Sequence, residues 1–121
     1  MLEVKVNYLL IIISIILSSF GQLAMKNGAN EISLQDGAIK LFIQFTTNLS
    51  ILSGLLMYGL STIVWIVALS RIQLSIAYPL VSLSYIIVVI LSYFIFNEPL
   101  SLQKILGLVF IIIGVIFIAR S

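Results

Sequence analysis

Four long apolar runs without a charged residue fill most of this chain. They cover residues 8–25, 49–69, 76–96 and 105–119. A helix needs about 20 predominantly apolar residues to cross a membrane. The first three runs have about this length. The fourth is shorter, but Lys104 and Arg120 bound it, and their long side chains can reach the membrane interfaces. The pattern predicts four transmembrane helices.

The composition agrees with this interpretation. Of the 121 residues, 62% are hydrophobic and 8% are charged, whereas soluble domains carry about 25% charged residues. We therefore expect residues 1–121 to form one all-α, four-helix transmembrane domain. Residues 21–26 offer no small-x-small cleavage site, so we expect the first run to remain as a span.

Several chemistries are excluded by the residues that the chain lacks. It contains no cysteine and no histidine, which excludes disulfides, thiol chemistry, Cys/His metal sites and histidine proton relays. It also has no phosphate-binding loop and no nucleophile elbow. A net charge of +2 is too small to indicate nucleic acid. We expect no enzymatic activity, cofactor or metal.

The segment 32–47 is amphipathic. Asp36, Lys40, Gln44 and Thr47 share one face of a helical wheel, while Ile39, Phe42, Ile43 and Phe45 lie elsewhere on it. This arrangement suits either a helix in the membrane interface or a tilted extension of the second span.

The cations are shared equally between the two sides of the predicted membrane. One side has Lys5, Arg71 and Arg120, and the other has Lys26, Lys40 and Lys104. Without a positive-inside bias, the chain can insert in either orientation, which allows an antiparallel dimer. The alternatives are different loop boundaries or a partner that fixes the orientation.

Polar residues within the spans are the candidates for function. Ser14, Ser18 and Gln22 repeat every four residues and form a stripe that ends beside Lys26. Hydrogen bonding between helices would explain most of the serines. Gln22 costs most to bury, which makes it the best pore-facing candidate. Lys26 is either an interfacial loop charge or a phosphate ligand.

The last two spans carry further candidates. Tyr78 and Tyr85 share a face as interfacial aromatics or cavity-lining groups, and Pro79 predicts a helix bend. Gly107 and Gly114 are seven residues apart and open one groove. This groove serves either packing within the chain or, as we prefer, a dimer interface.

The whole chain resembles the small multidrug resistance family of the drug/metabolite transporter superfamily. The similar parts are residues 21–26 at the end of the first helix, residues 76–78 at the start of the third, and the Gly107/Gly114 spacing. The resemblance implies an antiparallel dimer packed through the fourth helix. However, Ser18 stands where that family's exporters have their proton-binding glutamate, and Leu83 and Tyr85 stand where they have a glycine pair.

A closer resemblance is to the subunits of the undecaprenyl-phosphate-aminoarabinose flippase, which also lack the glutamate. The similar parts are Gly-Gln-Leu-x-x-Lys at residues 21–26, Ile-Ala-Tyr-Pro at 76–79, Ser82-Leu83, Glu-Pro-x-Ser at 98–101, and the spacing from Trp65 to Tyr78. The resemblance implies a paired transporter in the bacterial inner membrane that translocates a polyprenyl-phosphate-linked sugar.

Together, these features predict a lipid flippase that works as a homodimer or as a heterodimer with a related small membrane protein. We expect a substrate path formed by Ser18, Gln22, Lys26, Trp65, Arg71, Tyr78, Ser82, Tyr85 and Glu98. Lys26 or Arg71 would hold the phosphate, while Glu98 could instead pair with a lysine. The alternatives are an exporter of small polar or cationic metabolites and a non-transporting subunit of a membrane glycosyltransferase.

Overall fold

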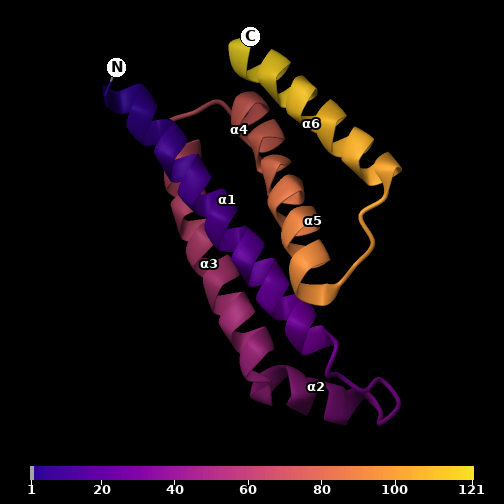
Figure 1. Cartoon of the computed structure of the whole chain (residues 1–121). Helices are drawn as coiled ribbons and strands as arrows, with labels where there is room; N and C mark the ends of the chain where they lie inside the picture. Colours follow the sequence, from indigo (N-terminus) through magenta and orange to yellow (C-terminus); the bar gives the residue numbers. More distant parts are fainter. Residues whose placement is uncertain (1) are drawn as a thin grey trace.

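The computed structural model describes residues 2–121, which are almost entirely helical (Figure 1). The helices are α1 (Leu2–Ala29), α2 (Ala38–Thr47), α3 (Leu49–Leu69), α4 (Leu74–Val81), α5 (Leu83–Phe96) and α6 (Leu102–Arg120). Four segments are long and apolar enough to cross a membrane: α1, α3, α4 with α5, and α6. The prediction of a four-helix transmembrane bundle is therefore confirmed.

Helices α1 and α3 form the most extensive contact of the bundle (Figure 1). Gly21 and Gly54 meet at their crossing. A Cβ atom built on Gly54 would lie 2.7 Å from the carbonyl oxygen of Gly21, and one built on Gly21 would lie 2.9 Å from that of Gly54. Small residues allow helix backbones in a membrane to approach this closely. The two glycines therefore set the distance between α1 and α3.

The third span is interrupted near its middle. Pro79 lies within α4, which ends at Val81, and α5 begins at Leu83. Proline has no N–H to donate to the carbonyl four residues earlier. After it, the N–H of Ser82 donates to the carbonyl of Pro79 at 3.0 Å, a bond that spans only three residues. The interruption thus falls at Ser82, three residues beyond the proline.

Asn48 separates α2 from α3. Its backbone is extended (φ −75°, ψ 115°), and it caps the end of α2 and the start of α3. The amphipathic segment therefore contains a separate helix and is not a continuation of the second span. This helix begins only at Ala38, because Gly37 has a left-handed φ of 89° that stops a helix from extending further back. Figure 1 shows α2 lying across the end of α3.

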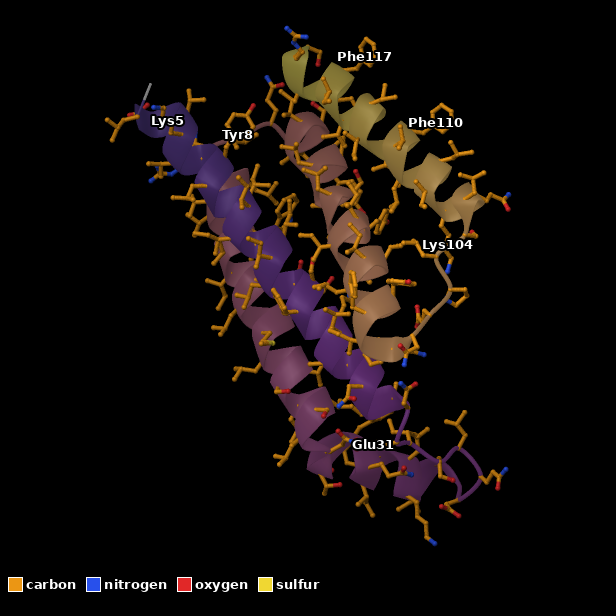
Figure 2. The ribbon with its side chains drawn as sticks, in the orientation of Figure 1. Lys5, Tyr8, Glu31, Lys104, Phe110 and Phe117 are labelled. Carbon is orange, nitrogen blue, oxygen red and sulfur yellow. The ribbon has the colours of Figure 1, made fainter. Side chains whose placement is uncertain are left out.

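The buried core of the bundle is small. Its cluster consists of Ile11, Ile15, Ala68, Ala77, Leu80 and Val115. Most other large apolar side chains are exposed, as expected where lipid is the solvent. Helix α6 is the extreme case, because Val115 is its one buried residue. Phe110 and Phe117 point away from the bundle (Figure 2).

The turn before α6 is fixed by local hydrogen bonds. Asn97 ends α5 in the left-handed conformation with φ 55°. The Ser101 hydroxyl accepts a hydrogen bond from the Lys104 N–H at 3.2 Å, which caps α6. The Lys104 ammonium donates to the Pro99 carbonyl at 2.8 Å, so this lysine bonds to the turn.

Candidate functional site

Hydroxyl groups from α1 and α3 meet in the middle of the bundle. The Ser14 hydroxyl donates to the Ser61 carbonyl oxygen at 3.0 Å, in a buried hydrogen bond that links the two helices. Ser18, one turn further along α1, donates to the Ile15 carbonyl of its own helix at 3.0 Å. The expected bonding between helices therefore applies to Ser14, whereas Ser18 bonds within α1.

These hydroxyls open onto a pocket of about 180 Å³. Its walls come from α1, α3 and α4, and its lining is Ser14, Ile15, Ser18, Tyr58, Ser61, Thr62, Trp65, Tyr78 and Val81. Ser14 and Ser61 are buried, while Tyr78 is 69% exposed and Tyr58 is 43% exposed. The pocket thus reaches from the buried contact between α1 and α3 to the outer surface of the chain.

The lining contains hydroxyls and aromatic rings but no charged side chain. The serine and threonine protons are already donated to backbone carbonyls. Besides the bonds of Ser14 and Ser18, the Ser61 and Thr62 hydroxyls both donate to the Tyr58 carbonyl, at 2.6 and 3.0 Å. A hydroxyl oxygen keeps its acceptor lone pairs after it has donated its proton. The pocket therefore offers these hydroxyl acceptors together with the N–H donor of Trp65 and the O–H groups of Tyr58 and Tyr78.

The structure brings three of the predicted substrate residues together in this pocket: Ser18, Trp65 and Tyr78. Gln22 and Lys26 lie further along α1 and are exposed. Ser82 and Tyr85 follow Tyr78 at the interruption of the third span and at the start of α5, outside the lining.

Arg71 and Glu98 lie elsewhere. Arg71 lines a separate, open hollow of about 350 Å³ with Glu3 and Asn7, near the start of α1. The Asn7 Oδ1 atom is buried there without a hydrogen-bond partner. Glu98 is half-buried in the turn before α6. Lys26 lies near the opposite end of α1 from Glu3, so Lys26 and Arg71 lie towards opposite ends of the bundle.

The candidate site also contains residues outside the predicted substrate path: Ser14, which belongs to the polar stripe of α1, and Tyr58, Ser61 and Thr62 of α3. For the three residues of α3, the sequence did contain a signal. Tyr58, Ser61 and Thr62 lie seven, four and three residues before Trp65, the spacing that places side chains on one face of a helix. Their pairing with the stripe on α1 depends on the crossing at Gly21 and Gly54, which the sequence pattern does not reveal.

Gly107 and Gly114 are exposed on α6. A Cβ atom built on either glycine has no described atom within 4 Å. Neither glycine packs against another helix of the chain, and the dimer interface stays a prediction.

Comparisons with known proteins give a consistent result. The model of a family described as "EamA-like transporter family" matches residues 5–120. Three similar proteins share the name "Probable 4-amino-4-deoxy-L-arabinose-phosphoundecaprenol flippase subunit ArnF". The one from Shewanella sediminis is 37% identical over 91% of this chain and 85% of its own length. Those from Aeromonas salmonicida and Proteus mirabilis are 35% and 36% identical, over 93% and 97% of this chain and 78% and 94% of their own lengths. No solved structure gives a significant match.

Proposed function

We propose that this chain, which belongs to the EamA-like transporter family, translocates a polyprenyl-phosphate-linked sugar across the bacterial inner membrane. The chain is a multi-pass membrane transporter rather than an enzyme. The proposal is supported by similar proteins that are named as subunits of a flippase for such a lipid. The observation that carries it is the uncharged pocket between α1, α3 and α4.

The pocket suits the sugar better than the phosphate. Ser14, Ser18, Ser61 and Thr62 present acceptors, which match the hydroxyl donors of a sugar but not a phosphate that carries negative charge. Trp65 and the two tyrosines add flat rings as well as N–H and O–H donors, but no cation lines the pocket to balance a phosphate. In this proposal the sugar occupies the pocket, and the exposed side of the pocket leaves the polyprenyl tail in lipid.

The phosphate then needs a cation outside the pocket. Lys26 lies eight residues beyond Ser18 on the same helix, about 12 Å along the axis at 1.5 Å per residue. We propose that Lys26 holds the phosphate at one interface and that Arg71 does so at the other. Gln22 lies between Ser18 and Lys26 and would contact the headgroup as it passes. Ser82, Tyr85 and Glu98 would contact it along α5 and the following turn.

The energy source is also part of the proposal. The four apolar runs contain no acidic residue. A mechanism that loads and unloads a buried carboxylate with protons therefore has no residue to use, and we propose flipping without proton coupling. The rival exporter of cationic metabolites would instead produce a substrate-dependent proton flux.

A vesicle assay tests the proposed function and the proposed site separately. The protein, extracted with any partner that accompanies it, is reconstituted with a polyprenyl-phosphate pentose. The sugar in the outer leaflet is then oxidised by membrane-impermeant periodate. Flipping makes the inner-leaflet sugar accessible as well, so more of it is oxidised than in protein-free vesicles. If the two preparations behave alike, the function is wrong.

Variants then address the site. We expect Trp65→Ala and Ser18→Ala to slow the oxidation of the inner-leaflet pool. The matched control is Ser53→Ala, because Ser53 is exposed on α3 and its hydroxyl bonds to Ser50 of the same helix. If wild-type protein flips the lipid and all three variants flip it equally fast, the function stands and the site assignment fails.

A further inference from the structure

Helix α2 is held in a fixed orientation at the end of α3. The Gln44 side-chain amide makes two bonds to Ser33 in the preceding loop: its Oε1 accepts from the backbone N–H at 2.9 Å, and its Nε2 donates to the carbonyl at 3.0 Å. At the other end, the Asn48 side chain donates to the Glu31 carboxylate at 3.1 Å. These bonds fix which side of α2 faces the protein and which side faces outward.

The outward side of α2 is apolar and uncovered. Ile39 is 80% exposed, Phe42 68%, Ile43 51% and Phe45 44%, and α2 has no buried residue. In the preceding loop, Leu34 is 77% exposed as well. An uncovered patch of this kind normally marks an interaction surface.

The position of α2 indicates what covers this patch. Helix α3, a membrane span, begins at Leu49, and Asn48 is the one residue between the two helices. The apolar patch therefore lies directly beside the end of a membrane span. With 10 residues, α2 is about 15 Å long and too short to cross a bilayer itself.

We propose that α2 lies in the membrane interface, with Ile39, Phe42, Ile43 and Phe45 inserted at the boundary between the lipid headgroups and the acyl chains. Helices of this kind are typically buried about 5–10 Å into that boundary. Lys40 and Thr47 are exposed on the polar side of α2, which remains towards water. Insertion fixes the depth at which α3 enters the bilayer, because Asn48 joins the two helices directly.

Apolar burial, rather than charge, holds α2 on the membrane. Glu31 and Asp36 carry negative charge, and Lys40 is the one cation between residues 27 and 48. The segment therefore has no excess positive charge with which to select anionic lipids. The insertion is expected in vesicles of zwitterionic phosphatidylcholine and should not depend on salt.

A single tryptophan can report the environment of α2. Trp65 is the only tryptophan of the chain, so a Trp65→Phe background is free of tryptophan emission. Phe42→Trp then places the probe on the apolar side. Lys40→Trp is the matched control, because residues two apart lie on nearly opposite sides of a helix. The full chain is reconstituted in phosphatidylcholine vesicles whose acyl chains carry bromine close to the headgroup.

For the Phe42→Trp protein we expect blue-shifted emission that bromine quenches and that aqueous acrylamide quenches weakly. For Lys40→Trp we expect the opposite ranking. Equal, strong quenching of both by acrylamide would mean that α2 lies in water. Protection of Phe42→Trp from both quenchers would mean that a protein covers the patch. Either result overturns the proposal. Should Phe42→Trp fail to fold, Ile39→Trp probes the same side and decides the question.

Discussion

The contact between Gly21 and Gly54 leaves no room for a side chain where α1 and α3 cross. A Cβ atom on Gly54 would meet the Gly21 carbonyl at 2.7 Å and the backbone nitrogen of Met25 at 2.9 Å. Backbone atoms cannot move aside as a flexible side chain can. A single methyl group must therefore push the two helices apart.

Gly54→Ala tests this contact. We expect it to destabilise the folded protein by about 1–3 kcal/mol, the usual cost of overpacking a tight contact. Gly59→Ala on the same helix is the control, because its Cβ has no neighbour within 4 Å. Stability is measured as reversible unfolding in mixed detergent micelles. Equal stability of both variants would contradict the close crossing.

The Ser14 hydroxyl contributes less to the stability of the folded protein than the contact between Gly21 and Gly54 does. Ser14→Ala removes the buried bond to the Ser61 carbonyl, and hydrogen bonds between membrane helices contribute about 0.6 kcal/mol on average. We expect a loss of this size in the same unfolding measurement. Ser53→Ala should leave stability unchanged, since its hydroxyl bonds only within α3. A loss as large as that of Gly54→Ala would show that Ser14 has a further role.

Among the helices, the start of α3 depends on the side chain of Asn48, the residue that precedes it. The Asn48 Oδ1 atom accepts a hydrogen bond from the Ile51 N–H at 3.1 Å, while its Nδ2 donates to Glu31. One side chain thus caps α3 and also ties it to the loop that follows α1.

Two substitutions at Asn48 separate these roles. Asn48→Ala removes both, and loss of an N-cap costs about 0.5–2 kcal/mol. Asn48→Asp keeps the cap acceptor but places a second carboxylate beside Glu31. We expect faster amide hydrogen exchange at residues 50–52 in Asn48→Ala, and near wild-type exchange there in Asn48→Asp. Equal exchange in Asn48→Ala and wild type would rule out the cap.

The sequence predicted most elements well, because lipid imposes a simple rule on composition. A span must be apolar over a fixed length, so the bounds of α3 could be read directly from its run of residues. Helix α1 is longer than its apolar run, since Glu3, Lys5 and Asn7 are compatible with a helix beyond the hydrocarbon region. The interruption at Ser82 was harder to place, because proline removes a hydrogen bond to the turn before it, whereas the break lies three residues after it.

The residues that line the pocket could be predicted only in part from the sequence. Ser18, Trp65 and Tyr78 could be selected one helix at a time, as polar or aromatic residues within apolar runs. Which residues of α3 face Ser14 and Ser18 depends on where the helices cross. That crossing point is set by a pair of glycines far apart in the sequence.

In the whole molecule, α6 is the membrane-spanning helix that is packed least against the rest of the chain. Gly107, Gly114, Phe110 and Phe117 are all exposed on it. We expect native mass spectrometry of the gently extracted protein to show a pair of four-helix chains carrying a polyprenyl-phosphate lipid. Gly107→Leu and Gly114→Leu should dissociate the pair while the single chain stays folded, because neither site has a neighbour within the chain.

The control for this experiment is Gly59→Leu, at an equally open position on α3. Dimers that persist in both α6 variants would place the interface elsewhere. A mass that fits a complex with an enzyme would instead support the glycosyltransferase-subunit alternative.

The close crossing of α1 and α3 also has a mechanical consequence. The glycine contacts make these two helices a stiff pair, whereas α4, α5 and α6 contact the rest of the chain much less extensively. The bundle therefore consists of a tightly packed, rigid half, formed by α1 and α3, and a loosely packed half, formed by α4, α5 and α6. The boundary between them passes through the pocket, since Ser18 and Trp65 belong to the rigid half and Tyr78 and Val81 to the other. Any hinge motion between the halves would change the width of the pocket while the contact between α1 and α3 stays intact.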